Sequence, residues 1–285
     1  MNNTVDLHIH STSSDGIFTP SELVKIAADA QIAVIAIADH DSVDGIDEAI
    51  YSAAAFGITV IPAVELSVEY EKYHDVHLLG YWIDHTDPAF VRMLSLFRKT
   101  RESRGLQVIE KINLKLATEG RTPIESTEVM ALAEGALGRP HIARILIEKG
   151  YSATMQDAFT NYLSPCNVPK EYLSFDAAIQ EIIRIGGVPV LAHPQSMSRN
   201  REELAKIIRE MSQQGLGGIE AFSTMGFDGD EGFLRQLAYS LGLAVTGGSD
   251  FHGTEEGLVM GKGRGNLHIT TAILEALDKK RPARL

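Results

Sequence analysis

Histidines and carboxylates recur at short intervals along this chain of 285 residues, which contains ten histidines. His8 and His10 are separated by one residue, so both imidazoles would face the same side of a β-strand. Neutral imidazole and carboxylate are ligands of first-row divalent metals. Nine such groups, more than one ion needs, are the candidate metal ligands: His8, His10, Asp15, His40, Glu65, His77, His193, Asp250 and His252.

Each of these residues, taken alone, has an ordinary structural explanation. A histidine near a strand end is often a satisfied polar residue, and an aspartate there often caps a helix. Nine together are not explained in this way, because they fall at or near the ends of six predicted strands. The C-terminal ends of parallel strands are where βα barrels build their active sites. The sequence therefore predicts a multinuclear metal site at that end.

Seven short apolar runs would form the strands that position these residues. Each is short and continuous, as expected of parallel strands buried on both faces. The runs are residues 5–9, 34–38, 59–64, 76–81, 188–192, 218–222 and 243–246. Helices are predicted between most of them. Thr19 to Glu22 has the pattern of a capping box, and Ser174 would cap a helix that Gly186 and Gly187 end.

The stretch from residue 88 to residue 167 breaks this alternation and is predicted to be helical throughout. We interpret it as a helical insertion that caps the substrate, carried by a barrel domain made of residues 1–87 and 168–285. The expected fold class is α/β. The alternation of strands and helices would also fit an open, doubly wound sheet.

The composition, with 44% hydrophobic and 22% charged residues, is that of a globular protein. A formal net charge of -12 argues against broad binding of duplex nucleic acid. It permits a phosphorylated substrate, since bound metal ions would supply a local positive centre. Cys166 is the one cysteine, and we find no signal peptide or membrane span, so the expected location is the cytoplasm.

Arg139 and His141 flank Pro140 at a predicted helix start. A capped surface helix explains this pattern as well as an anion site does. In the anion site, the planar guanidinium and the helix N-terminus would hold a phosphate. The glycine-rich run 261–265 has neither Walker nor dinucleotide spacing and is predicted to be a loop, with substrate contact by Lys262 or Arg264 as the lesser alternative.

The ordered set of motifs resembles that of the PHP (polymerase and histidinol phosphatase) phosphoesterases, over nearly the whole chain. The motifs are His8-Ile9-His10 with Asp15, Asp39-His40, Glu65, His77, His193-Pro194 and Asp250-Phe251-His252. The resemblance implies a distorted (β/α)7 barrel with a trinuclear centre. Carried over by position, it implies one ion held by His8, His10, Glu65 and Asp250. Glu65 would bridge to a second ion on His77 and His193, and Asp15, His40 and His252 would hold the third.

The insertion and its Gly138-Arg139-Pro140-His141 motif resemble one bacterial branch of this family, the nucleoside 3′,5′-bisphosphate phosphatase or RNase AM type. That branch removes the 3′-phosphate to give 5′-nucleotides, and some members trim short RNAs from the 5′ end. The resemblance implies two or three divalent ions, with manganese expected first and iron or zinc as alternatives.

Three residue roles and two rival functions follow. Glu65, as the bridging carboxylate, and His252, as a candidate general acid, are the expected catalytic residues. Arg139 and His141 would bind a second phosphate of the substrate. One rival is a small-metabolite phosphatase such as histidinol phosphatase. The other, from a different class, is a non-catalytic, metal-stabilised interaction module.

Overall fold

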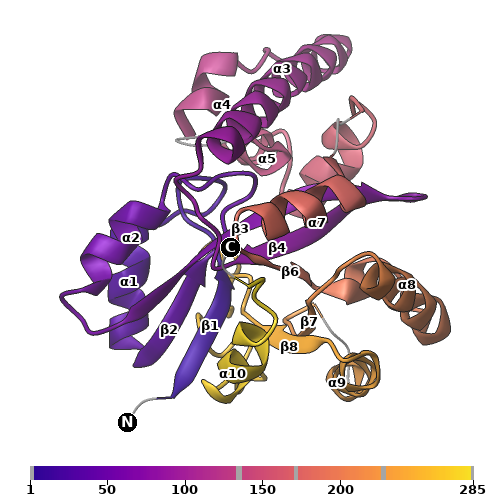
Figure 1. Ribbon diagram of the computed structural model, residues 1–285. Coiled ribbons are helices and arrows are strands. Elements are labelled where there is room, and N and C mark those ends of the chain that lie inside the picture. Colours follow the sequence, from indigo (N-terminus) through magenta and orange to yellow (C-terminus); the bar gives the residue numbers. More distant parts are fainter. Residues whose placement is uncertain (1–2, 133–136, 170–172, 226–228, 284–285) are drawn as a thin grey trace.

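The computed structural model describes residues 3–132, 137–169, 173–225 and 229–283. Its centre is one curled sheet of mixed direction, in the order β1-β2-β3-β4-β6-β7-β8 (Figure 1). The strands are β1 (Thr4–Ile9), β2 (Ile32–Ile37), β3 (Thr59–Tyr70), β4 (Tyr73–Tyr81), β6 (Val188–Leu191), β7 (Gly218–Phe222) and β8 (Ala244–Gly247). A two-residue strand, β5 (Leu173–Ser174), pairs with β3 outside this path. All seven predicted strands are therefore present.

The prediction that all seven strands are parallel was wrong at β4, which is antiparallel to both β3 and β6. Only Glu71 and Lys72 separate β3 from β4, so the two strands form a hairpin with no helix between them. Tight hairpin turns usually contain glycine or asparagine, which accept a positive φ. Here Glu71 takes that conformation, with a φ of 50°. The turn therefore carries no sequence signal, and β3 runs to Tyr70, well beyond the predicted end.

The two ends of the strand path meet through irregular backbone contacts. The segment after β8 runs beside β1, where Asp250 N donates to His8 O at 2.8 Å and His10 N donates to Phe251 O at 2.9 Å. Ile9 and Phe251 form a parallel bridge. The first and last groups of candidate ligands are thereby held side by side, although about 240 residues separate them in the sequence.

Helices cover the outer face of the sheet (Figure 1). The helices α1 (Pro20–Asp29) and α2 (Ile46–Ala53) pack with β2 in one apolar cluster. The helices α7 (Phe175–Arg184), α8 (Arg201–Gln213) and α9 (Asp230–Leu241) pack on β3, β4 and β7 in another. The predicted caps are confirmed: Thr19 and Glu22 form a capping box, and Ser174 accepts a hydrogen bond from Ala177 N.

A further apolar cluster joins residues of strands from β1 through β8, and we call it the inner cluster. Strands that are not neighbours in the sheet contact each other there, so it lies on the concave face. Ala36, Ala63, Leu79, Tyr81 and Val190 belong to it. The last helix, α10 (Ala272–Asp278), contributes Leu277 to the same cluster. The inner cluster forms the base on which the polar residues of the concave face rest.

Every element that the structure describes between residues 88 and 167 is a helix, as the sequence predicted. These are α3 (Pro88–Thr118), α4 (Ser126–Leu132), α5 (Arg139–Glu148), α6 (Met155–Ala158) and a π-helix (Phe159–Leu163). They lie together at the top of Figure 1 and share an apolar cluster of their own, which includes Val108, Ile112, Ile142 and Tyr162. None of the described helices is both long and apolar enough to cross a membrane.

Gly248, directly after β8, lies where the two ends of the sheet pack against each other. A Cβ atom there would lie 2.3 Å from His8 Cβ and 2.4 Å from His8 N. Since β1 cannot move away without breaking its ladder, we expect Gly248→Ala to lower the free energy of unfolding by about 1–3 kcal/mol. Thermal and urea denaturation measure this loss.

Gly232 provides the matched control, because it is exposed on α9 and its added methyl group would meet nothing within 4 Å. Because alanine has a higher helix propensity than glycine, Gly232→Ala in the first turn of α9 should be neutral or stabilising by up to about 1 kcal/mol. Equal stability of Gly248→Ala and the wild type would contradict the close packing of β8 against β1.

Candidate metal centre

The carboxylate of Glu65 lies at the centre of the candidate site and is almost completely buried. Five imidazole rings surround it: His8, His10, His40, His77 and His193. Three of their nitrogens lie 3.0–3.3 Å from its Oε2 atom, and the other two lie 3.0 and 3.1 Å from its Oε1 atom. Two further carboxylates, Asp15 and Asp250, lie 3.3 and 3.1 Å from the nearest histidine nitrogens. The structure thus brings all nine predicted ligands together.

Strand alternation directs Glu65 and His77 into the site. Ala63 belongs to the inner cluster, and Glu65 follows it on the same face of β3. On β4, Leu79 belongs to the inner cluster, and His77, two residues before it, lies on the same face. Glu65 pairs directly with Leu79 across the two strands. Glu65 and His77 are therefore diagonal neighbours on the concave face. The expectation that Glu65 ends its strand was wrong, since both residues lie within the β3–β4 hairpin.

Left-handed backbone conformations turn two other ligands into the site. His193, after β6, has a φ of 25°, and Asp250, after β8, has a φ of 55°. Such conformations are uncommon for residues other than glycine and cluster at functional sites. His40 follows β2 and forms an isolated parallel bridge with Glu65, which continues the sheet up to the metal centre.

Three groups of ligand atoms are compact enough to hold a metal ion, with all atoms of a group within 4.8 Å of one another. The groups are His8, His10, Glu65 and Asp250; His10, Asp15, His40 and His252; and His40, Glu65 and His77. His193 belongs to none of them, but its Nε2 atom lies 3.3 Å from His77 Nδ1. The first group has the members expected for one ion. The other two differ from the expected sets, because His10 is added to one, and His40 replaces His193 in the other.

Unsatisfied polar atoms converge on the same point. In the described parts of the chain, five buried ligand atoms have no hydrogen-bond partner: His8 Nε2, both ring nitrogens of His10, His40 Nδ1 and Glu65 Oε2. Buried polar atoms are normally hydrogen-bonded, and each one left without a partner costs about 1–3 kcal/mol. Divalent cations bind imidazole nitrogens and carboxylate oxygens, and would satisfy these atoms. The residues present therefore fit a metal centre.

Glu220 on β7 is a functional residue that sequence reasoning missed. It is fully buried, its Oε1 accepts a hydrogen bond from His8 Nδ1 at 3.1 Å, and its Oε2 accepts one from His193 N at 2.8 Å. The first bond fixes a proton on His8 Nδ1, so that Nε2 is the nitrogen that would bind an ion. The available signal was a glutamate in the middle of an apolar strand.

Two more buried carboxylates hold the loops that carry ligands. Asp39 accepts hydrogen bonds from Ser11 N, Ser11 Oγ and Ser14 Oγ, which fixes the turn before Asp15. Asp6 accepts from Ser249 N, Ser249 Oγ and Gly261 N, which fixes the segment before Asp250. Each of these aspartates thus positions a loop through several directed bonds.

Protons on histidines compensate the carboxylates in the metal-free protein. Burial alone would raise the pKa of Glu65, but His40, His77 and His8 hold it well below its usual range. Burial opposes the charged form of His252 as well, yet the Asp15 carboxylate raises the pKa of that ring to about 10. The pKa of His8 is also raised well above its usual value, against burial, by Glu65 and Glu220.

Arg139 and His141 lie at the start of α5, in the helical region. His141 is buried, and its Nδ1 accepts a hydrogen bond from Gly138 N at 3.0 Å. Its Nε2 atom must then carry the ring proton and can only donate. The guanidinium of Arg139 is half-buried and lies 5.5 Å from the centre of the Phe159 ring. Both residues therefore offer donors only, as an anion site requires.

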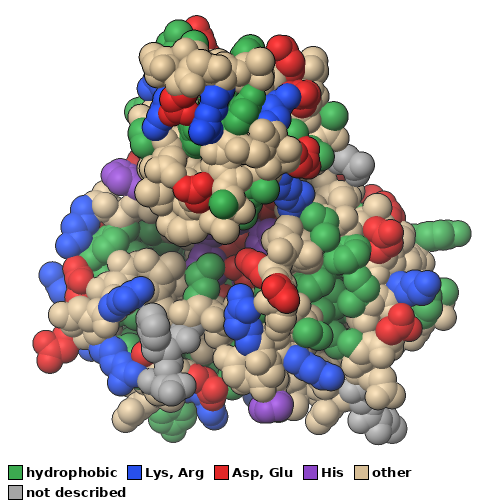
Figure 2. All heavy atoms as spheres, turned by 180° about the vertical axis from the view of Figure 1, so that it is seen from behind, with side chains coloured by type: hydrophobic (Ala, Val, Ile, Leu, Met, Phe, Trp, Pro, Cys, Tyr) green, Lys and Arg blue, Asp and Glu red, His purple; other side chains and the backbone are tan. Residues whose placement is uncertain are grey.

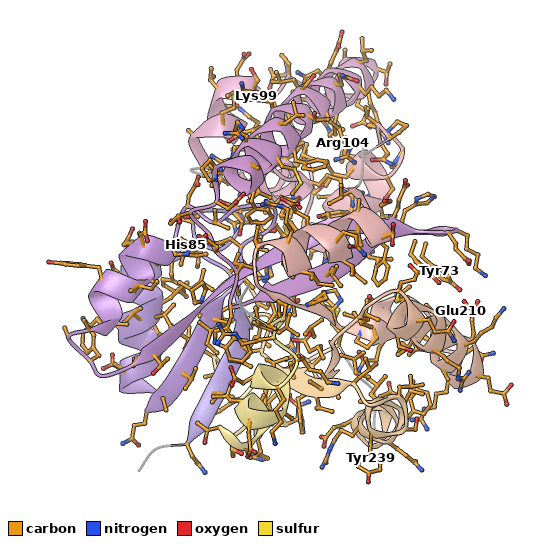
Figure 3. The ribbon with its side chains drawn as sticks, in the orientation of Figure 1. Tyr73, His85, Lys99, Arg104, Glu210 and Tyr239 are labelled. Atoms are coloured by element: carbon orange, nitrogen blue, oxygen red, sulfur yellow. The ribbon has the colours of Figure 1, made fainter. Side chains whose placement is uncertain are left out.

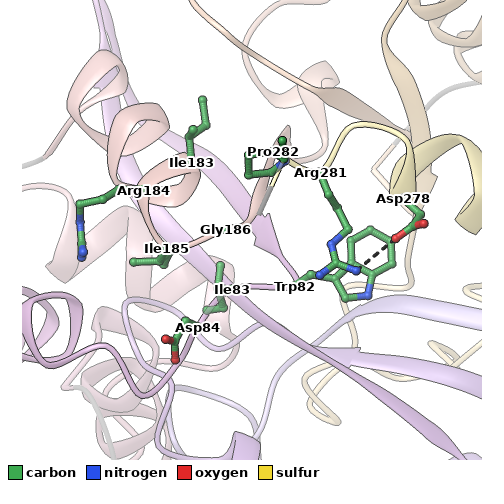
Figure 4. A pocket seen from close by; sticks show the side chains of 11 residues that line it. Trp82, Ile83, Asp84, Ile183, Arg184, Ile185, Gly186, Asp278, Arg281 and Pro282 are labelled. Carbon is green, nitrogen blue, oxygen red and sulfur yellow. Dashed lines mark hydrogen bonds and ion pairs between the residues drawn. The ribbon is translucent and has the colours of Figure 1, made fainter. Parts of the chain in front are cut away.

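The surface view from behind shows histidine and acidic side chains in a hollow near the middle of the molecule, below the helical region (Figure 2). A separate cavity of about 810 Å³ lies between the end of β4 and the C-terminal segment (Figure 4). Trp82, Ile183, Ile185 and Arg281 are among its lining residues, and none of the nine candidate ligands is. That cavity is therefore not part of the metal centre.

Metal binding should compete with these protons. Since His252 is protonated below a pH of about 10 in the metal-free protein, an incoming ion must displace that proton. We expect the affinity for Mn²⁺ to rise by about tenfold per pH unit for each proton displaced, between a pH of about 6.5 and about 8.5. Titration calorimetry in buffers of different ionisation enthalpy counts the protons released.

His74→Gln is the control for this experiment, because the exposed His74 ring lies outside the centre. Its affinity and its proton count should equal those of the wild type. An affinity for Mn²⁺ that does not change with pH would contradict the proposed competition.

Comparisons with known proteins agree with this geometry. The model of the PHP domain matches residues 6–217. A 5′-3′ exoribonuclease of Haemophilus influenzae is 31% identical over 98% of this chain and 100% of its own length. A 3′,5′-nucleoside bisphosphate phosphatase of Chromobacterium violaceum is 32% identical over 89% of this chain and 88% of its own length.

A solved structure, an amidohydrolase from Chromobacterium violaceum with bound sulfate and no metal, is 30% identical and superimposes with a TM-score of 0.84 over 98% of both chains. Similarity of this extent spans both the curled sheet and the helical region. The family model alone spans most of the chain. This chain belongs to the PHP domain family.

Proposed function

We propose that this chain is a metal-dependent phosphoesterase that removes the 3′-phosphate of nucleoside 3′,5′-bisphosphates to give 5′-nucleotides, and that it also trims short oligoribonucleotides from the 5′ end. The observation that carries the proposal is the buried Glu65 carboxylate among five imidazoles. The activities named for the Haemophilus and Chromobacterium relatives support it. Sulfate, which has the shape of phosphate, is bound by the similar solved structure.

We propose that the nine clustered residues hold two or three divalent ions, with manganese expected first and iron or zinc as alternatives. Bound ions of this kind supply Lewis acidity at phosphoryl oxygens and activate water. Three divalent ions carry six positive charges and the three carboxylates return three negative charges. The site would therefore attract a phosphate within an acidic protein.

The hydrogen bonds of His252 favour a ligand role over the role of general acid. Its Nδ1 atom lies 2.9 Å from Asp250 O and donates to it, and its Nε2 atom lies 3.3 Å from Asp15 Oδ1. A ring whose Nδ1 proton is held by a carbonyl and whose Nε2 atom binds a metal has no proton to give. We propose that His252 positions an ion, and that the leaving oxygen takes its proton from water.

We propose that Arg139 and His141 hold the second phosphate of a bisphosphate substrate. Both are donors at the start of α5, where the helix dipole also favours an anion. A phosphate held there would fix which ester reaches the metal centre. A monophosphate such as histidinol phosphate would not use this site.

We further propose that residues 88–167 form a substrate-capping domain on a barrel of residues 1–87 and 168–285, and that the barrel is a distorted (β/α)7 barrel of the PHP type. The separate apolar cluster of the helical region supports the division. The curled path of seven strands supports the barrel. A cytoplasmic location and the lack of broad duplex binding stay predictions from composition.

Glu65→Gln tests the metal centre. Neutralising this carboxylate removes the charge that five histidines share, so we expect the loss of at least one ion by elemental analysis and at least a 100-fold loss of turnover. Circular dichroism should show an unchanged fold. Glu69→Gln is the matched control, because Glu69 lies on the same strand with its side chain exposed. Wild-type turnover of Glu65→Gln at equal metal content would refute the assignment.

Arg139→Ala tests the substrate class. We expect kcat/KM for 3′,5′-bisphosphoadenosine to fall about 10- to 150-fold, the value of one charge-assisted hydrogen bond. An aryl phosphate, which lacks the second phosphate, should be little affected. Arg139→Lys should recover only part of the loss, because lysine cannot make the planar two-point contact.

An equal loss on both substrates would mean that Arg139 is structural. Turnover of histidinol phosphate with Mn²⁺, in preference to 3′,5′-bisphosphoadenosine, would favour the small-metabolite phosphatase. Turnover of neither phosphate ester by the metal-loaded protein would favour the non-catalytic module.

A further inference from the structure

Charge is unevenly divided between the helical region and the rest of the chain. Residues 88–167 contain eleven Lys and Arg against eight Asp and Glu, whereas the remaining residues contain fifteen against thirty. The helix α3 alone contains seven Lys and Arg against two Glu. An acidic protein thus carries one strongly basic helix. Clustered positive charge on one element indicates a polyanionic partner.

A groove of about 540 Å³ runs along this helix. It is lined by Lys99, Thr100, Ser103, Arg104, Gln107, Val168 and Pro169. The five residues from α3 recur every three or four positions and so share one helix face. All five have side chains that can donate hydrogen bonds, and none of the described lining residues has a carboxylate. The lining is therefore suited to anionic oxygen atoms.

The lining residues of the groove include one that is bonded within the protein and two whose donors could bind a ligand. Arg104 holds the segment opposite α3 in place, since its Nε donates to Val168 O at 2.7 Å and its Nη2 donates to Asn167 Oδ1 at 2.9 Å. Lys99 and Gln107 are exposed and make no hydrogen bond or ion pair within the described parts of the chain. Figure 3 labels Lys99 and Arg104 on α3, above the barrel. Lys99 and Gln107 are the donors that a ligand could use.

Arg98, directly before Lys99, contacts the loop that follows the candidate ligand His40. Its Nη2 atom lies 2.6 Å from Asp44 Oδ2 and 3.4 Å from Ser42 Oγ, in the loop that follows the candidate ligand His40. Its Nε atom is buried and has no hydrogen-bond partner among the described residues. At a rise of about 1.5 Å per residue, the helix extends about 14 Å from Arg98 to Gln107. Lys99, the first lining residue of the groove, therefore directly follows a residue that contacts the loop beside the metal centre.

We propose that this face of α3, with the segment 168–169, binds the phosphodiester backbone of single-stranded RNA on the 3′ side of the nucleotide in the metal centre. The inference rests on the proposed function and adds a binding surface that a nucleoside bisphosphate does not need. None of the described lining residues has an aromatic ring on which a base could stack. Binding would therefore follow the charge of the strand and be independent of its sequence.

Lys99→Glu is the test, with two substrates that separate the groove from the metal centre. For a 5′-phosphorylated octaribonucleotide we expect kcat/KM to fall about tenfold, mainly through KM. For 3′,5′-bisphosphoadenosine we expect a change of less than about twofold. The dependence of log KM on log salt for the octamer should lose about 0.7 in slope for each phosphate contact removed. Gln107→Glu should act in the same direction.

Lys206→Glu is the matched control, because Lys206 is an exposed lysine on α8, far along the chain from the groove. It makes the same change in net charge and should leave both substrates unaffected. A parallel loss on both substrates after Lys99→Glu, or no loss on the octamer, would overturn the proposal.

A binding measurement separates failure of the groove proposal from failure of the proposed catalytic function. Fluorescence anisotropy of a 3′-labelled octaribonucleotide needs no turnover and can be made with Glu65→Gln and with the double variant Glu65→Gln, Lys99→Glu. Binding that weakens about tenfold in the double variant supports the groove even if neither substrate is hydrolysed. Equal binding by the two variants counts against it, whatever the activity.

Discussion

One buried carboxylate, that of Glu65, determines much of the structure around it. An ionised group in the protein interior loses its hydration, which costs on the order of several kcal/mol unless opposite charge and hydrogen-bond donors replace the water. Five imidazoles supply that replacement here, and they come from β1, β4 and the ends of β2 and β6. The sheet must therefore curl far enough to bring these strands to one point.

A second layer of buried carboxylates repeats this principle farther from the centre. Glu220, Asp39 and Asp6 each accept two or more hydrogen bonds from loops or rings that carry ligands. The directions of these bonds matter for the site, because Glu220 orients the His8 ring, and Asp39 and Asp6 fix the loops that precede Asp15 and Asp250. In the absence of cations, the neighbouring carboxylates raise the pKa of His8 and of His252, which favours protons on these two rings.

The nine clustered residues and the seven strands could be predicted from the sequence because every strand is an apolar run, and six of the seven runs contain or precede a candidate ligand. The hairpin of β3 and β4 could not, since its turn residues Glu71 and Lys72 have no turn signature. Glu220 was missed because a single glutamate in an apolar strand has no spacing pattern to identify it. The donor character of His141 depends on a bond to Gly138 that only the folded backbone forms.

The contact between the segment after β8 and the end of β1 has a consequence for how the chain is made. Asp250 N bonds to His8 O across a separation of about 240 residues, so this contact is among the most non-local in the fold. Contacts between distant parts of a chain form late, because a long loop must close first. During synthesis His8 leaves the ribosome long before Asp250 is added to the chain. Until then His8 and His10 lack the Asp250 carboxylate beside them. The centre with all nine residues can therefore be complete only after synthesis is nearly finished.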